Sequence, residues 1–149
     1  MKHKQESSAG GIVYKKTDDN DVLWLITQHS KHKGWGFPKG LIGDELENEK
    51  MEDAAIREVE EEGGVRAQII HPDPISVSYK YRYEEYLVDK SVHYFLMKYI
   101  SGDTNNHDWE VSEAKFVNEK EAMDTLTFKT DKDAFEKILK IYNEENTSV

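Results

Sequence analysis

The sequence predicts an α/β fold in which helices cover both faces of a mixed β-sheet. Strand-like segments come first, at residues 8–15 and 22–28, and a helical segment follows within residues 43–65. Further strand-like segments then lead to a second amphipathic helix at residues 134–142. This order of elements is typical of a mixed sheet packed between helices.

Composition and charge limit the classes of protein to consider. The chain has 149 residues, 37% of them hydrophobic, which predicts one soluble domain that we place at residues 5–145. The net charge of −10 argues against a surface that binds duplex nucleic acid. The longest apolar run, Val22–Ile26, is too short to cross a bilayer, and no signal peptide is visible. The absence of cysteine excludes disulfides and thiolate metal sites, and it fits a cytoplasmic protein.

Two antiparallel strands are predicted near the N-terminus. Residues 8–15 and 22–28 are rich in apolar side chains, and turn-forming residues separate them, which predicts a hairpin. Glycines and prolines in residues 29–43 predict a loop that leads to the first helix. Lys39 in this loop could direct its ammonium at a phosphate group, although a loop lysine is as often simply solvated.

The first helix carries an unusual distribution of charge. At about 100° per residue, the face that a globular protein buries carries Met51, Ala54, Ala55 and Val59. Glu58, Glu61 and Glu62 fall on or beside that face, where their charges repel each other and lose hydration unless a cation is supplied. A hard divalent cation, usually Mg²⁺, meets this need. An acidic helix alone is more often a solvated face, so the assignment needs support from the residues around it.

The ends of this helix have recognisable signals. Asn48 is a plausible N-cap, because its side chain can accept a hydrogen bond from a backbone amide of the first turn. Gly63 and Gly64 predict the C-terminal end, because glycine accepts the left-handed conformation that a C-cap needs.

Beyond the helix, strands are predicted at residues 65–70, 75–83, 92–100 and 113–117. Apolar and polar residues alternate in 75–83, whereas the composition of 92–100 predicts burial on both faces. In the second of these strands, Tyr79 and Tyr81 share a face, whereas Lys80 lies on the other face. Tyrosines on a strand can stack on a nucleobase, although sheet packing is their commoner use. His93 lies inside the third strand, where a core histidine and a substrate contact are equally good interpretations.

The spacing around the three carboxylates resembles the Nudix box. Gly43 is followed after five residues by Glu49, and after seven more by Arg57-Glu58-Val59-x-Glu61-Glu62-x-Gly64-Val65. The resemblance implies a Nudix-type α/β/α sandwich with a mixed sheet, and hydrolysis of a nucleoside diphosphate linked to another group. The shorter segments AGGIVY, WGFPKG and KSVHYFLM look most like the branch that hydrolyses dinucleoside polyphosphates, especially asymmetric diadenosine tetraphosphate hydrolases.

The resemblance also implies a metal site and a set of catalytic groups. The cofactor is Mg²⁺, with Mn²⁺ as a substitute, and the expected ligands are Glu58, Glu61, Glu62, the carbonyl of Gly43 and Glu110. Glu113 is the alternative to Glu110, and either of these is more often a plain surface residue. The expected catalytic residues are Glu58, Glu61 and Arg57, with the guanidinium orienting a neighbouring carboxylate. Which glutamate accepts the proton of the attacking water stays open.

Several functions remain in competition at this stage. The first is a pyrophosphohydrolase acting on a dinucleoside polyphosphate, with substrate contacts from Lys39, Tyr79, Lys80, Tyr81 and His93. The second is an enzyme of the same chemistry that acts on RNA 5′ ends, oxidised nucleotides or ADP-ribose. The third is a Nudix-fold nucleotide-binding regulator without turnover, which the intact carboxylates disfavour. The expected partner is a small nucleotide, with no membrane and no duplex nucleic acid, and the oligomeric state is left open.

Overall fold

A computed structural model of the chain describes residues 1–43 and 48–147. Its elements, in chain order, are the strands β1 Lys2–Lys16, β2 Val22–His29, β3 Trp35–Gly36 and β4 Lys39–Leu41, helix α1 Met51–Gly63, strands β5 Val65–Ile69, β6 Ile75–Tyr83 and β7 Tyr86–Gly102, the 3-10 turn η1 Thr104–Asn106, strand β8 Val111–Val117, and helices α2 Glu119–Thr125 and α3 Lys129–Thr147.

Strand β1 is the centre of one mixed sheet. It pairs in parallel with β7 from Lys2 opposite Tyr86 to Tyr14 opposite Lys98. On its other edge it pairs antiparallel with β2 and with β4. Strand β8 extends the sheet beyond β2, while β5 and β6 both pair with β7. The predicted N-terminal hairpin and the mixed sheet are therefore confirmed.

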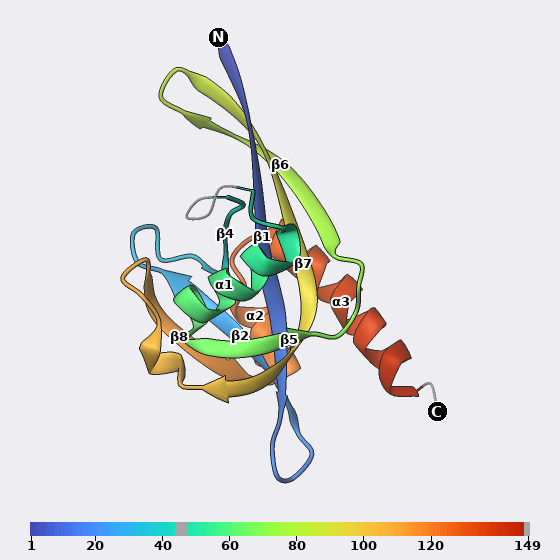
Figure 1. Cartoon of the computed structure of the whole chain (residues 1–149). Helices are drawn as coiled ribbons and strands as arrows, with labels where there is room; N and C mark the ends of the chain where they lie inside the picture. Colours follow the sequence, from blue (N-terminus) through green and yellow to red (C-terminus); the bar gives the residue numbers. More distant parts are fainter. Residues whose placement is uncertain (44–47, 148–149) are drawn as a thin grey trace.

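Helices α1 and α3 pack on opposite faces of this sheet (Figure 1). The two faces follow the alternation of β1, because Ile12 and Tyr14 lie in the aromatic core beside α3. Val13, between them, lies in the core beneath α1, which is lined by small residues of the helix such as Ala54 and Ala55. The α/β/α sandwich predicted from the sequence is confirmed. No helix in the described ranges is both long and apolar enough to span a membrane.

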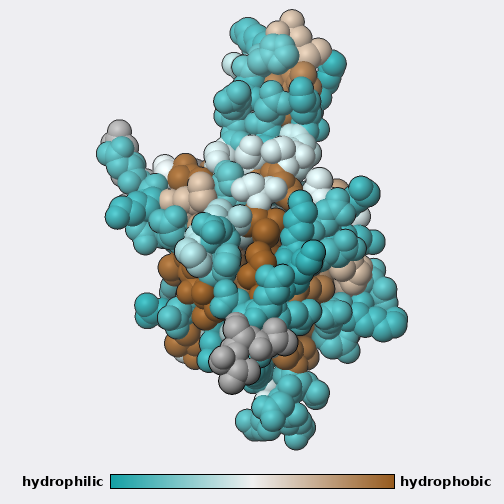
Figure 2. Space-filling model, turned by 90° about the vertical axis from the view of Figure 1, so that its right-hand side faces the viewer, coloured by the Kyte–Doolittle hydropathy of each residue, from teal (hydrophilic) through white to brown (hydrophobic). Residues whose placement is uncertain are grey.

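Two strands are longer than the sequence pattern predicts. Strand β1 begins at Lys2 and β7 at Tyr86, several residues before their apolar segments start. The added residues form a ribbon with β6 that projects from the body of the molecule (Figure 1). Hydrophilic residues cover most of this projection (Figure 2). The ribbon was missed because its added segments, residues 2–7 and 86–91, are rich in polar and charged residues, although Val88 within them is buried.

The ends of α1 agree only partly with the prediction. Its N-cap residue is Lys50, with no side-chain cap, so the prediction of Asn48 is wrong. Asn48 instead has a left-handed backbone with φ 65°. At the other end, Gly64 is the C-cap with φ 77°, and its amide donates to the carbonyl of Glu60. This left-handed residue turns the chain directly into β5.

Candidate active site

A buried ion-pair network covers the acidic face of α1. Arg57 donates through Nε and Nη2 to both carboxylate oxygens of Glu49, at 2.8 and 2.9 Å. Its Nη1 donates to Oε1 of Glu58 at 2.9 Å and to Oε2 of Glu61 at 3.2 Å. A guanidinium has enough fixed donors to hold several carboxylates in this way. Arg57 therefore fixes the orientation of Glu58 and Glu61, two of the three α1 carboxylates predicted as metal ligands.

Glu58 is buried, with 3% of the residue exposed. Burial raises the pKa of Glu58 to about 7, and repulsion from Glu61 adds to this effect while Arg57 opposes it. Gly40 of β4 runs directly against the carboxyl group, since a Cβ at this position would lie 2.1 Å from Glu58 Cδ. The close approach of this backbone requires glycine, which sequence reasoning missed because it singled out Gly43.

Glu62 lies beside Glu58 at the end of the acidic face. Its Oε1 accepts a long hydrogen bond of 3.4 Å from the backbone amide of Lys39. Burial raises the pKa of Glu62 to about 8, and the charge of Glu58 raises it further while Lys39 opposes the rise. Glu58 and Glu62 therefore both have a raised pKa, although Arg57 and Lys39 oppose the rise.

The loop after β7 brings a further carboxylate to this place. The amide of Asp108 donates to the carbonyl of Glu61 at 2.8 Å, which fixes the loop on α1. Glu110 follows, and its charge contributes to the raised pKa of both Glu58 and Glu62. Glu113, the alternative, instead forms an ion pair of 3.8 Å with Lys115. Of these two carboxylates, Glu110 lies in the loop that is bonded to α1, whereas Glu113 belongs to β8.

The donor set suits an oxygen-preferring divalent cation. Glu58, Glu61, Glu62 and Glu110 together supply hard oxygen ligands of the kind that Mg²⁺ and Mn²⁺ prefer. Within residues 1–43 and 48–147, no three such side chains stand close enough together to hold a metal ion as they are now oriented. Arg57 binds Glu58 and Glu61 in this arrangement, so the guanidinium supplies the positive charge that the carboxylates need. Gly43 joins the same network through its amide, which donates to Glu49 at 3.3 Å.

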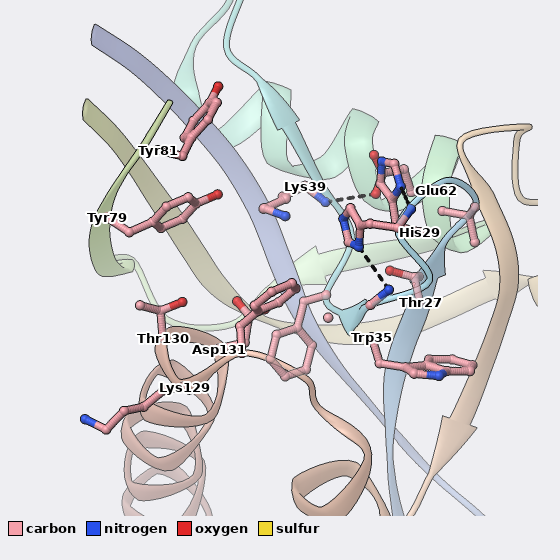
Figure 3. A pocket seen from close by; sticks show the side chains of 16 residues that line it. Thr27, His29, Trp35, Lys39, Glu62, Tyr79, Tyr81, Lys129, Thr130 and Asp131 are labelled. Carbon is pink, nitrogen blue, oxygen red and sulfur yellow. Dashed lines mark hydrogen bonds between the residues drawn. The ribbon is translucent and has the colours of Figure 1, made fainter. Parts of the chain in front are cut away.

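A pocket of about 480 Å³ opens next to Glu62, on the α3 side of the sheet. Figure 3 shows Glu62 at one side of it, Tyr79 at the other and Lys39 between them. Its walls are largely aromatic, and its lining is formed by Thr27, His29, His32, Gly34, Trp35, Gly36, Phe37, Lys39, Glu62, Tyr79, Tyr81, Val111, Phe128, Lys129, Thr130 and Asp131. The pocket has the size and character of a small-molecule site.

Three of the five predicted substrate contacts, Lys39, Tyr79 and Tyr81, line this pocket. The other two do not. Lys80 lies on the opposite face of β6 and forms an ion pair of 3.5 Å with Asp89. His93 lies on the α1 side of the sheet, where its Nδ1 is 2.6 Å from Ser76 Oγ and burial lowers the pKa of its ring.

The pocket wall opposite the tyrosines contains residues that sequence reasoning did not assign to the site. The rings of His29 and His32 stack at 4.1 Å, and Phe128 packs edge-on against His32 at 5.8 Å. Phe128 precedes α3 and carries no pattern that points to a ligand. His29 and His32 belong to the loop predicted at residues 29–43. Their closeness to each other and to lysines in the sequence could have indicated a phosphate site, but loop histidines are usually solvated.

A polar cluster holds the tyrosine wall in place. The hydroxyl of Tyr81 donates to Glu6 Oε1 at 2.5 Å, and burial, with Glu6 beside it, raises the pKa of Tyr81 to about 12. Lys90 lies 3.6 Å from the same carboxylate oxygen. Tyr81 is thus anchored through its hydroxyl, whereas the described residues offer no such bond to the hydroxyl of Tyr79, which keeps its ring available to a ligand.

The fold and the site together define a class of α/β proteins in which carboxylates on a helix flank a small-molecule pocket. The family model of the NUDIX domain matches residues 4–138 of the chain. The chain therefore belongs to the NUDIX family.

Individual relatives agree with this membership. The chain is similar to the MutT4 protein of Mycobacterium tuberculosis (strain CDC 1551 / Oshkosh), with 34% identity over 133 residues, which are 86% of this chain and 52% of MutT4. The chain thus spans about half the length of this curated relative. The crystal structure of a C. elegans Ap4A hydrolase binary complex has a TM-score of 0.78 at 22% identity, covering 93% of this chain and 98% of that one. The NUDIX domain of Shewanella oneidensis NrtR, complexed with ADP ribose, has a TM-score of 0.64 at 19% identity, covering 95% and 88%.

Proposed function

We propose that this chain is a pyrophosphohydrolase that cleaves a nucleoside diphosphate linked to another moiety and depends on Mg²⁺, with Mn²⁺ as a substitute. One observation carries the proposal: Glu62 belongs both to the acidic face of α1 and to the lining of the aromatic pocket. A ligand whose base occupies the pocket would place its phosphates beside the carboxylates. That position is where a divalent cation and a polyphosphate must meet.

The acidic face would bind the cation. Glu58, Glu61, Glu62 and Glu110 are its proposed ligands, and the cation, when bound, would neutralise phosphate oxygens and lower the pKa of the attacking water. Gly43, whose carbonyl the resemblance to the Nudix box implied, stays a candidate metal ligand at the edge of this network. Arg57 would keep the carboxylates oriented through its bonds to Glu49, Glu58 and Glu61.

The same carboxylates would handle the proton. Attack of water on phosphorus releases a proton that a neighbouring base must accept. Glu58 is the best placed candidate, because the protein shields it from solvent and holds it next to Arg57. Glu61 is the second candidate, since it shares the same guanidinium donor. Lys39 lines the pocket and would bind an outer phosphate.

The proposed substrate is a dinucleoside polyphosphate such as diadenosine tetraphosphate. Tyr79 and Phe128, both partly exposed at the pocket, offer aromatic faces for a nucleobase. The structural likeness to the C. elegans Ap4A hydrolase supports this choice. Because the carboxylates lie on one helix, a long polyphosphate would be attacked at one position, giving ATP and AMP from diadenosine tetraphosphate.

A substrate panel tests the proposal. Diadenosine tetraphosphate, ADP-ribose, an oxidised deoxynucleoside triphosphate and a 5′-triphosphorylated RNA are each incubated with the protein and Mg²⁺, and the products are separated by chromatography. We expect ATP and AMP from the first compound as the preferred reaction. Turnover of none of the four would contradict the proposed chemistry. Two ADP as the sole products, or a clear preference for ADP-ribose, would remove only the substrate assignment.

A further inference from the structure

Asp131 is a buried carboxylic acid on the floor of the pocket, and the proposed hydrolysis does not use it. It belongs to the first turn of α3 and is 7% exposed, yet it lines the pocket together with Tyr79 and Lys39 (Figure 3). The hydroxyl of Tyr94, from β7, donates to its Oδ1 at 2.9 Å. Burial raises the pKa of Asp131, whereas the charge of Lys39 and the bond from Tyr94 oppose this rise. A polar group in such a place is costly unless it has partners.

The second carboxyl oxygen of Asp131 remains available to a ligand. Oδ2 accepts no hydrogen bond from the part of the chain that the structure describes. Gly36 of β3 lies next to this atom, and a Cβ at position 36 would stand 3.0 Å from Oδ2. The backbone of Gly36 does not have a positive φ, so conformation alone does not require glycine here. The missing side chain therefore leaves the approach to Oδ2 open from the pocket.

Lys39 connects this floor to the acidic face. It lines the same pocket as Glu62 and Asp131, and its backbone amide donates to Glu62 Oε1 at 3.4 Å. A nucleotide whose phosphates lie at Glu62 and Lys39 would extend its base toward Asp131. Tyr79 and Phe128 would then contact the faces of the base, and Asp131 its edge.

We propose that Asp131 Oδ2 accepts a hydrogen bond from the exocyclic amino group of the substrate's base, which selects adenine over 6-oxo purines. This inference rests on the proposed function for the position of the phosphates. A single open acceptor matches the 6-amino group of adenine. Hypoxanthine presents a carbonyl oxygen at the same place, so it would have to shift along its edge to bring its N1 proton to the carboxylate. The edge of guanine offers two adjacent donors and would need both carboxyl oxygens, but Tyr94 already occupies Oδ1.

The test compares paired adenine and inosine compounds. We measure kcat/KM for diadenosine and diinosine tetraphosphate, and binding of AMP and IMP by calorimetry in Mg²⁺ buffer. We expect the protein to prefer adenine by roughly tenfold to a hundredfold, as for loss of a hydrogen bond to a charged group. In Asp131→Asn this preference should fall to within about threefold or reverse, because an amide can also donate to a carbonyl. No adenine preference in the unsubstituted protein, or an unchanged preference in Asp131→Asn, would overturn the proposal.

Two further variants separate recognition from a structural role. Asp133→Asn removes a carboxylate from the same part of α3; Asp133 pairs with Lys129 at 3.5 Å but does not itself line the pocket, so this variant should keep the preference. Gly36→Ala places a methyl group against Oδ2 and should weaken AMP binding more than IMP binding. If Asp131→Asn does not fold, this variant tests whether Oδ2 recognises adenine. If no compound is hydrolysed, the proposed function fails, whereas the AMP and IMP affinities still decide the role of Asp131.

Discussion

Replacing Glu58 with glutamine should stabilise the metal-free protein at alkaline pH. Glu58 is held almost entirely away from water, in contact with Gly40 and next to other carboxylates. Its ionised form is therefore disfavoured in the folded state, and glutamine has nearly the same shape without the charge. The substitution is expected to lower activity and to raise the free energy of unfolding.

The size and sign of this effect follow from the pKa of Glu58, which folding raises from 4.5 to about 7. Because the folded protein holds the proton more tightly than the unfolded chain does, this group stabilises the fold fully below about pH 4.5. That stabilisation is lost as the pH rises through about 7, and it amounts to about 3 kcal/mol. Glu58→Gln lacks the titration and keeps its stability, so its advantage should be negligible at about pH 4.5 and close to the full amount at about pH 8.5.

The assay is urea unfolding followed by circular dichroism, in chelator, at several pH values between these limits. Glu60→Gln is the matched control, because Glu60 lies on the same helix but is exposed. Its free energy of unfolding should follow that of the unsubstituted protein at every pH. If Glu58→Gln were less stable than the unsubstituted protein at about pH 8.5, burial could not be the main influence on Glu58.

Three further outcomes are expected. Excess chelator should stop hydrolysis, and added Mg²⁺ or Mn²⁺ should restore it; full activity in metal-free buffer would refute the ligand assignment. Glu110→Gln should lower kcat more than Glu113→Gln, and equal rates for the two variants would argue against a role for the loop after β7 at the acidic face. Tyr79→Ala should raise KM by about tenfold through lost stacking, while Tyr83→Ala, at the exposed end of the same strand, should leave KM unchanged. A similar rise in both variants would contradict the assignment of nucleobase binding to Tyr79 in the pocket.

The sequence predicted the elements whose side chains have a regular pattern. The periodicity of α1 correctly predicted that Ala54, Ala55 and Val59 are buried. Its acidic residues also identified the NUDIX family, which the comparisons confirm. The alternation of β6 likewise grouped Tyr79 and Tyr81 on one face. Helix α2 was missed because its few residues bury only Ala122, so it carries no readable periodicity.

The features that the sequence could not predict are contacts between segments that are distant along the chain. Strand alternation shows that Lys80 and Tyr79 face opposite sides, but it does not show which side carries the pocket. The proximity of Gly40 to Glu58 arises only when β4 pairs with β1 over the helix. Asp131 likewise becomes a pocket residue only because α3 begins beneath β3 and β7, where Tyr94 and Gly36 reach it.

The most direct test of the central claim compares turnover of diadenosine tetraphosphate by Glu62→Gln and Glu60→Gln at saturating Mg²⁺. Glu62 is the side chain that the acidic face and the pocket share, whereas Glu60 lies on the exposed side of the same helix. We expect kcat to fall by on the order of a hundredfold or more in Glu62→Gln and to stay unchanged in Glu60→Gln. Equal turnover by the two variants would contradict the assignment of the active site to this face of α1.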